Sequence, residues 1–207
     1  MNPFRDKSNI ILNMSQTPSI IVVDNFYRNP MEVREFALKQ NFSTTGNFPG
    51  YRTDQPYATD ELRDLMQSYL KPFGMEIDTW NNKPGDYHNG MFQYTTAEDR
   101  SWVHTDSYTD MAGVLYMTPD APFSAGTGFY RAKDPEDEKT PLSRGHCMDM
   151  TKWDLVDQIG NVFNRLMLFN SNQYHMSMDY FGDCKENGRL FQVFFFKTKK
   201  RDKAYNI

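Results

Sequence analysis

The chain has 207 residues, a formal net charge of −4 at pH 7 and two cysteines. This length predicts a single domain over 1–207, large enough to bury a core without disulfides. The acidic balance disfavours a nucleic-acid-binding protein. Two cysteines are too few for a disulfide framework and favour a reducing compartment such as the cytoplasm. We expect neither a signal peptide nor a membrane span, because no apolar run is long enough.

The N-terminal third reads as a support of one strand and two helices. Residues 1–18 are polar and mixed, so we expect a loosely ordered lead-in. The support itself covers 19–74. Its predicted elements are a strand over 19–23, a helix over 31–39 preceded by Pro30, a long loop over 41–58 rich in Gly, Pro, Thr and Asn, and a helix over 61–70 capped by Thr59 or Asp60.

From residue 75 the helical spacing gives way to short apolar runs broken by turns. The predicted strands cover 75–80, 88–95, 111–117, 126–131, 164–169, 173–177 and 190–198. The other predicted segments are a turn over 81–86, a charged surface excursion over 132–150 and a short helix or turn over 153–160. Several short strands at regular spacing are typical of a sandwich or barrel. We therefore predict an α+β, mainly β fold: a double-stranded β-helix, or cupin-like jelly roll, over 75–200, with the N-terminal helices packed on it.

A His and a carboxylate stand two residues apart in the segment Trp102-Val103-His104-Thr105-Asp106. On an extended segment, His104 and Asp106 point to the same face. A third ligand from a distant strand, for which we nominate His175, would complete the 2-His-1-carboxylate facet of non-haem Fe(II) oxygenases. A jelly roll can bring such distant strands side by side.

Each part of this pattern has a simpler interpretation on its own. A His-X-Asp pair occurs in many solvated loops, and His175 could be a buried strand histidine with a structural partner. His88 and His146 have no carboxylate at the matching spacing and are expected to be structural or surface residues. The order and setting of His104, Asp106 and His175 favour the joint interpretation.

Arg189 opens the apolar strand Arg189-Leu190-Phe191-Gln192-Val193-Phe194-Phe195-Phe196, and Phe191 and Val193 share its face. The guanidinium is therefore aimed into the barrel, where a buried cation needs a partner. A bound dicarboxylate would supply one by bidentate pairing. We nominate Arg189 as the anchor of an acidic co-substrate.

These residues, in this order, resemble the Fe(II)/2-oxoglutarate-dependent oxygenase superfamily, in particular its prolyl-4-hydroxylase-like branch. The segment 126–131 resembles the strand that follows the metal motif there, and Ile21-Val22-Val23-Asp24-Asn25-Phe26 resembles the start of a little-characterised subgroup. The resemblance implies that His104, Asp106 and His175 bind Fe(II). It also implies that Arg189 and Tyr94 bind 2-oxoglutarate.

The implied activity is a hydroxylase-type dioxygenase that uses O2 and releases succinate and CO2. The sequence departs from the pattern of this superfamily at two positions. Many relatives carry Ser or Thr where this chain has Phe191, and the prolyl hydroxylases often have Lys at the position of Arg189.

Two other functions remain open from the sequence. One is a metal-free jelly-roll module that binds carbohydrate or peptide through aromatics such as Tyr51, Tyr57 and Trp80. The other is a cupin-like metalloenzyme that does not use 2-oxoglutarate. The substrate, a protein side chain or a small molecule, and the oligomeric state are not encoded in any recognisable motif. Residues that could line a substrate site are Tyr51, Arg52, Trp102 and Arg131, although the sequence favours a packing or surface role for each of them.

Overall fold

The structure is a computed structural model that describes residues 18–81, 88–138 and 143–200. The lead-in predicted over 1–18 and the turn predicted over 81–86 lie almost wholly outside this part of the chain. Among the described residues, no helix has the length and apolar character that crossing a bilayer requires.

The described chain contains three α-helices and eleven strands. The helices are α1 (Pro30–Leu38), α2 (Asp60–Leu70) and α3 (Arg144–Met148), with short 3-10 helices at Lys71–Phe73, Pro135–Glu138 and Met150–Lys152. The strands are β1 (Ile20–Val23), β2 (Phe42–Gly46), β3 (Phe48–Thr53), β4 (Met75–Thr79), β5 (Phe92–Thr95), β6 (Met111–Tyr116), β7 (Thr127–Ala132), β8 (Trp153–Ile159), β9 (Leu166–Asn170), β10 (His175–Ser177) and β11 (Arg189–Lys200).

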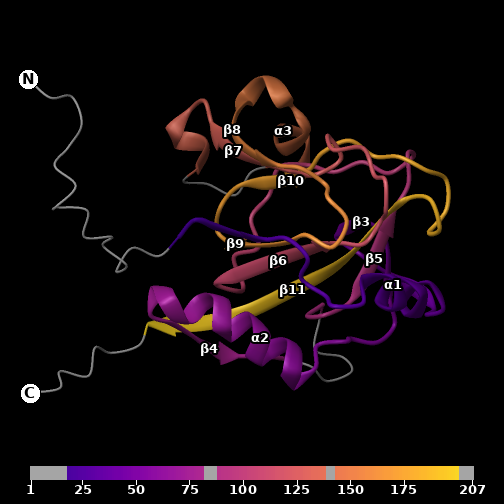
Figure 1. Ribbon diagram of the computed structural model, residues 1–207. Coiled ribbons are helices and arrows are strands. Elements are labelled where there is room, and N and C mark those ends of the chain that lie inside the picture. Colours follow the sequence, from indigo (N-terminus) through magenta and orange to yellow (C-terminus); the bar gives the residue numbers. More distant parts are fainter. Residues whose placement is uncertain (1–17, 82–87, 139–142, 201–207) are drawn as a thin grey trace, which may run out of the picture.

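Two antiparallel sheets and a helical layer build the molecule (Figure 1). The larger sheet has the order β1-β9-β6-β11-β5-β3-β2, with β4 paired to the second half of β11. The smaller sheet has the order β10-β7-β8 and lies over one face of the larger. Helices α1 and α2 cover the opposite face. This is the predicted jelly roll with N-terminal helices packed on it.

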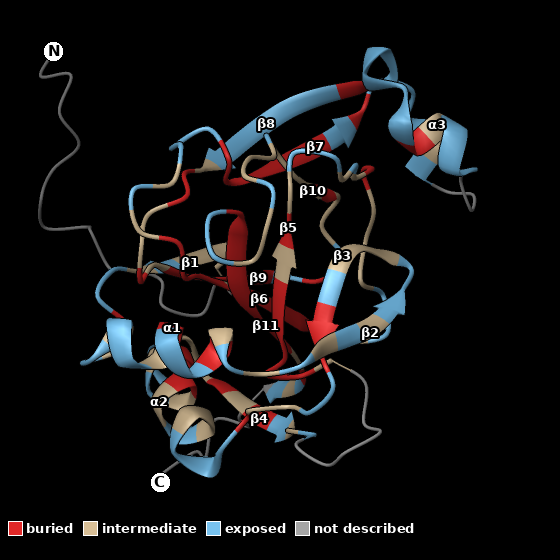
Figure 2. Ribbon diagram, turned by 90° about the vertical axis from the view of Figure 1, so that its right-hand side faces the viewer, coloured by how far each residue is buried: buried red, intermediate tan, exposed pale blue. Residues whose placement is uncertain are grey.

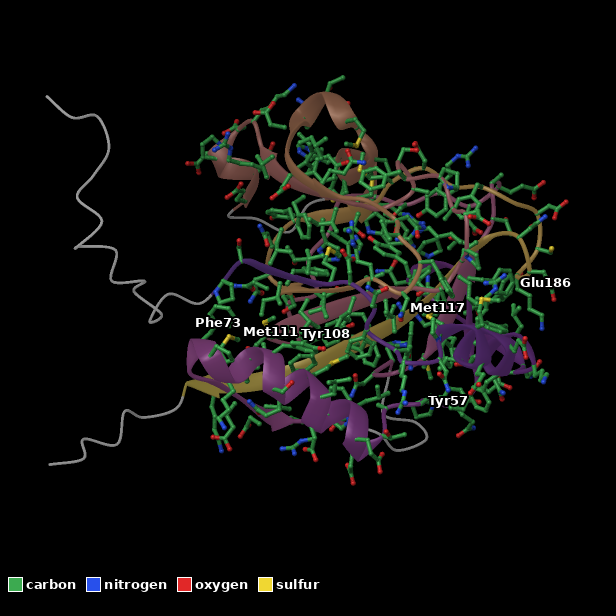
Figure 3. The ribbon with its side chains drawn as sticks, in the orientation of Figure 1. Tyr57, Phe73, Tyr108, Met111, Met117 and Glu186 are labelled. Atoms are coloured by element: carbon green, nitrogen blue, oxygen red, sulfur yellow. The ribbon has the colours of Figure 1, made fainter. Side chains whose placement is uncertain are left out.

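The helical layer forms where the sequence provides caps and an apolar face. The Thr59 hydroxyl accepts a hydrogen bond from the Leu62 amide at the start of α2, and Gly74, with φ of 69°, ends the 3-10 helix that follows α2. Met66 and Leu70 of α2 are fully buried against the sheet. Helix α1 is tied to two loops by Arg34, whose guanidinium donates to the carbonyl oxygens of Met117 and Glu186, both labelled in Figure 3.

Strand β11 lies at the centre of the larger sheet between β6 and β5, and most of its residues from Arg189 to Phe196 are buried on both faces (Figure 2). Its even-numbered apolar residues pack into the core shared with the helices: Leu190, Phe194 and Phe196. Its odd-numbered apolar residues face the smaller sheet: Phe191, Val193 and Phe195. Because successive side chains point to opposite faces, this one strand contributes both to the core beneath the helices and to the interior between the two sheets.

The loop predicted over 41–58 is wrong, because the segment contains β2 and β3 and extends the larger sheet. The pairing of β2 with β3 is irregular, with register shifts, and Gly50 has φ of 69°. A side chain at Gly50 would collide with the Tyr94 carbonyl oxygen, so the Pro-Gly pair marks a close approach of two strands rather than a loop.

The helix or turn predicted over 153–160 is also wrong, because this segment forms β8 at the edge of the smaller sheet. Only Trp153 of this strand is buried, and its middle residues are exposed (Figure 2). An edge strand without a buried face has no apolar alternation, so pairing with β7 decides its structure.

Candidate metal and co-substrate site

A backbone bridge between two distant segments holds the two candidate histidines together. The His104 amide donates to the His175 carbonyl oxygen at 3.0 Å, and the His175 amide donates back to the His104 carbonyl oxygen at 2.9 Å. His175 begins β10, which pairs with β7. The imidazole ring centroids lie 4.4 Å apart.

Asp106 joins the pair because its amide donates to the Ser171 carbonyl oxygen at 2.8 Å, which fixes the turn after His104. One carboxylate oxygen lies 3.4 Å from His175 Nε2 and the other 4.0 Å from His104 Nε2. One ligand atom from each of the three residues lies within 4.8 Å of the others. The structure thus brings together His104, Asp106 and His175, as the sequence predicts.

Each imidazole is oriented by a hydrogen bond to the backbone carbonyl oxygen two residues earlier in the chain. The Nδ1–H of His104 donates to the Trp102 carbonyl oxygen at 2.9 Å, and that of His175 donates to the Gln173 carbonyl oxygen at 2.8 Å. A carbonyl oxygen only accepts, so Nδ1 carries the proton in each ring. In the neutral rings each Nε2 then presents a lone pair to the centre of the site.

The electrostatics keep these donor atoms ready for a cation. Burial, reinforced by the neighbouring His175, lowers the pKa of His104 to about 4, so its ring is neutral at pH 7. Burial alone would raise the pKa of Asp106, but interactions with His175, His104 and Arg52 outweigh it and lower that pKa. Two nitrogen lone pairs and a carboxylate that face one another fit a divalent metal of the Fe(II) type.

The cluster of His104, Asp106 and His175, called here the candidate metal facet, opens into a cavity of about 500 Å³ between the two sheets. Polar residues line it around that cluster and on β3, β5 and β7, and apolar residues line the rest of its wall. The apolar walls include Phe48, Trp102, Val114, Phe169, Phe191, Val193 and Phe195. A cavity with apolar walls and a few convergent polar groups is typical of a small-molecule site.

Arg189 is fully buried behind this cavity. Its Nε donates to the Ala125 carbonyl oxygen at 3.0 Å, and its guanidinium stacks on the Phe191 ring at 4.3 Å. Nη1 is buried and has no hydrogen-bond partner among the described residues. A buried cationic donor left without an acceptor fits an anion such as a carboxylate.

Hydroxyl groups that the sequence analysis missed surround Arg189. Tyr116 on β6 and Thr127 on β7 share a hydrogen bond of 2.9 Å, and Thr127 lines the cavity. The Tyr180 hydroxyl is buried and interacts with Ser101 and Ser177, and the charge of Arg189 acts on it. These hydroxyls come from three other segments and fit the role that Ser or Thr would have at the position of Phe191.

Tyr94 is not brought to this end of the cavity. It stacks on Tyr51 with ring centroids 5.7 Å apart and contacts Phe42. The neighbouring Gln93 lines the cavity instead. Successive residues of a strand face opposite sides, so Tyr94 lies on the face of β5 that points away from the cavity.

Of the four residues that the sequence offered as possible substrate contacts, two line the cavity and two do not. Arg52 and Trp102 line it, whereas exposed Arg131 and Tyr51 do not. His88, which the sequence analysis left as structural or surface, also lines it, with φ of 87° that is rare outside glycine. The remaining histidine, His146, pairs with Asp137 at 3.0 Å on the excursion over 132–150 and lies outside the cavity.

The segment over 132–150 supports the segment that carries His104. The Val103 amide donates to the Cys147 carbonyl oxygen at 3.0 Å, and the Arg144 guanidinium lies 4.0 Å from the centre of the Trp102 ring. Helix α3 therefore contacts the two residues that precede His104 from outside the cavity.

Comparison with known families identifies a family without an assigned activity. A model described as "Family of unknown function (DUF6445)" matches residues 7–152, which include His104 and Asp106. The chain belongs to the DUF6445 family. No curated protein matches this DUF6445 chain.

Solved structures share the fold of the DUF6445 chain at low sequence identity. A prolyl hydroxylase from Trichoplax adhaerens, in complex with a hypoxia inducible factor peptide fragment, is 14% identical with a TM-score of 0.53 over 91% of this chain and 88% of that chain. HygX from Streptomyces hygroscopicus, with nickel, 2-oxoglutarate and hygromycin B bound, is 11% identical with a TM-score of 0.57 over 89% and 85%. The carbocyclase SnoK, described as non-haem and α-ketoglutarate-dependent, is 10% identical with a TM-score of 0.51 over 97% and 88%. The DUF6445 chain therefore has the fold of the Fe(II)/2-oxoglutarate-dependent oxygenases.

Proposed function

We propose that this protein is an Fe(II)- and 2-oxoglutarate-dependent dioxygenase of the hydroxylase type. It would oxidise a C–H bond of a protein side chain or a small molecule with O2, and release succinate and CO2. The observation that carries the proposal is the convergence of His104, Asp106 and His175 in the wall of a cavity, with a buried guanidinium behind it whose Nη1 has no hydrogen-bond partner among the described residues.

His104, Asp106 and His175 would hold the metal. The backbone carbonyl oxygens of Trp102 and Gln173 keep the two rings in the tautomer and orientation that ligation needs. Three ligands on one facet leave the cavity side for co-substrate and O2. Bound Fe(II), with 2-oxoglutarate and O2, supplies the oxidising chemistry.

Arg189 would pair with the distal carboxylate of 2-oxoglutarate, with Tyr116, Tyr180 and Thr127 as nearby hydroxyls. One charge-assisted hydrogen bond of this kind contributes about 1.5–3 kcal/mol. The apolar walls of the cavity would exclude water from the reacting centre.

The fit of the site argues against both alternatives left open by the sequence. A metal-free binding module has no use for two imidazoles held in the ligating tautomer around a carboxylate. A metalloenzyme that does not use 2-oxoglutarate has no use for a buried guanidinium with an unpaired Nη1 behind the candidate metal facet.

The test is turnover of 2-oxoglutarate to succinate by the purified full chain with Fe(II), in air, without added substrate. We expect slow turnover, abolished by His104→Ala. The matched control is His146→Ala, which removes a histidine outside the cavity and should turn over like the wild type. Calorimetry gives the second readout: 2-oxoglutarate should bind the Mn(II)-loaded protein, and Arg189→Gln should weaken this binding whereas Arg131→Gln should not.

Equal turnover by wild type and His104→Ala would overturn the assignment of the metal site. Binding of Mn(II) without any binding of 2-oxoglutarate would favour the cupin-like metalloenzyme. A wild-type protein that binds neither would favour the metal-free module.

A further inference from the structure

The cavity has a second buried cation that the proposed function does not use. Arg52 on β3 lines the cavity and is only 6% exposed. Arg189 lies against Tyr116 and Phe191, whereas Arg52 lies against Phe48 and Phe195. Phe191 and Phe195 are four residues apart on the same strand face, about 13 Å at the usual rise. The two guanidinium groups therefore belong to different parts of the cavity wall.

Neutral groups hold Arg52 in place. Its Nε donates to the Gln93 side-chain oxygen at 2.7 Å, and the Gln93 amide nitrogen donates to the Pro49 carbonyl oxygen at 2.6 Å, which fixes the Gln93 amide. The guanidinium carbon lies 3.9 Å from the centre of the Phe48 ring. Gln93 and Phe48 orient the guanidinium without neutralising it.

No carboxylate in the described part of the chain forms an ion pair with Arg52. Burial lowers the pKa of Arg52 to about 10, with Tyr108 and Asp106 acting in the opposite direction, so the group is charged at neutral pH. A buried charge without a partner is costly, and natural proteins retain one mainly where a ligand pairs with it.

The charges of the proposed complex leave Arg52 uncompensated. Asp106, the acid whose charge acts on Arg52, is also a proposed metal ligand. The two positive charges of Fe(II) and that of Arg189 balance those of Asp106 and the 2-oxoglutarate dianion. One further negative charge, from the substrate, would therefore neutralise the site.

We infer that Arg52 binds a carboxylate of the substrate, and that the substrate is a carboxylic acid whose body is largely apolar. The inference rests on the proposed function, because it adds a substrate carboxylate at Arg52 to the 2-oxoglutarate proposed at Arg189 in the same site. The apolar body is expected to lie along Phe195, Val193 and Trp102, all of which line the cavity.

The test is a titration of the full chain loaded with Mn(II) and saturated with 2-oxoglutarate, which keeps Arg189 occupied. The probes are hexanoate and 3-phenylpropanoate, each beside its primary amide, which has nearly the same shape without the charge. We expect the tighter-binding acid to bind the wild type at least tenfold more tightly than its amide. Arg52→Gln should reduce this preference to less than threefold, while its affinity for 2-oxoglutarate stays within threefold of the wild type.

Arg52→Lys keeps the charge and should retain part of the preference, and far-UV circular dichroism checks that each variant is folded. If neither acid is preferred over its amide in the wild type, or if Arg52→Gln keeps the preference, the inference is overturned. Loss of 2-oxoglutarate binding in Arg52→Gln would also overturn it, because Arg52 would then be the co-substrate anchor. Failure of the wild type to bind 2-oxoglutarate at all would instead overturn the proposed function.

Discussion

The two faces of β11 show how one strand can serve stability and chemistry separately. On the face toward the helices, Leu190 and Phe194 are fully buried in the larger core, and Gln192 on the same face accepts a hydrogen bond from the Tyr27 hydroxyl at 2.6 Å. On the face toward the smaller sheet, Phe191 and Val193 line the cavity and Arg189 lies behind it. Changes on the first face should alter the free energy of unfolding, and changes on the second should alter binding.

A large loss of Mn(II) affinity is expected from a change at the candidate metal facet, which adjoins the cavity face of β11. Asp106→Ala removes the proposed negatively charged ligand and should weaken Mn(II) binding by more than about 100-fold, beyond the loss typical of residues that only orient ligands. Calorimetric titration of the metal-free protein measures this. Asp154→Ala, which removes an exposed carboxylate on β8, is the control and should bind like the wild type. Comparable Mn(II) affinity in both variants would remove Asp106 from the site.

An effect of comparable size is expected on the helix-facing side. Phe194→Ala removes a fully buried ring that stacks on Trp80 at 6.1 Å and should lower the free energy of unfolding by about 3–5 kcal/mol. Urea unfolding measures the loss. Phe123→Ala, at a ring that is 65% exposed, should change it by less than about 0.5 kcal/mol. Should Phe194→Ala instead leave stability unchanged and abolish metal binding, the division between the faces fails.

A smaller effect is expected from the buried cation of the cavity face. Arg189→Met should weaken binding of 2-oxoglutarate to the Mn(II)-loaded protein by about 1.5–3 kcal/mol, or roughly 10- to 100-fold. Its Mn(II) affinity without 2-oxoglutarate should stay near that of the wild type, because Arg189 is not a metal ligand. Competition calorimetry separates the two constants. A variant that loses Mn(II) and keeps 2-oxoglutarate would reverse the assignment.

The smallest effect lies outside both faces, in the helical layer. Thr59→Ala removes the hydroxyl that accepts from the Leu62 amide and should cost about 1 kcal/mol of stability, with metal and 2-oxoglutarate binding unchanged in the folded protein. Thr45→Ala, at an exposed position of β2, is the control in the same unfolding experiment. A loss of 2-oxoglutarate affinity in Thr59→Ala would show that the helical layer is coupled to the cavity.

The parts of the site that the sequence predicted depend on local geometry. His104 and Asp106 share a face because two residues separate them, and Arg189 enters the barrel because its strand alternates. The pairing of His104 with His175 followed from the fold class. Strand β8 was missed because an exposed edge strand has no apolar period, and β2 and β3 were missed because proline and glycine suggested a loop.

What the sequence did not predict about the site is which face of a strand lines the cavity and which distant segments come together there. Alternation in β5 separates Gln93 from Tyr94, but nothing local tells which of the two faces the cavity. Tyr116, Thr127 and Tyr180 come from three segments that only the folded chain brings near Arg189. His88 gave no motif, and its place in the cavity wall depends on a backbone conformation with positive φ.

A crystal structure of the full chain with Mn(II) and 2-oxoglutarate tests the central claim most directly. We predict one anomalous-scattering peak bonded to Nε2 of His104, Nε2 of His175 and a carboxylate oxygen of Asp106, with the distal carboxylate of 2-oxoglutarate paired to the Arg189 guanidinium. A metal bound elsewhere, or these three side chains turned away from a common centre, would contradict the account.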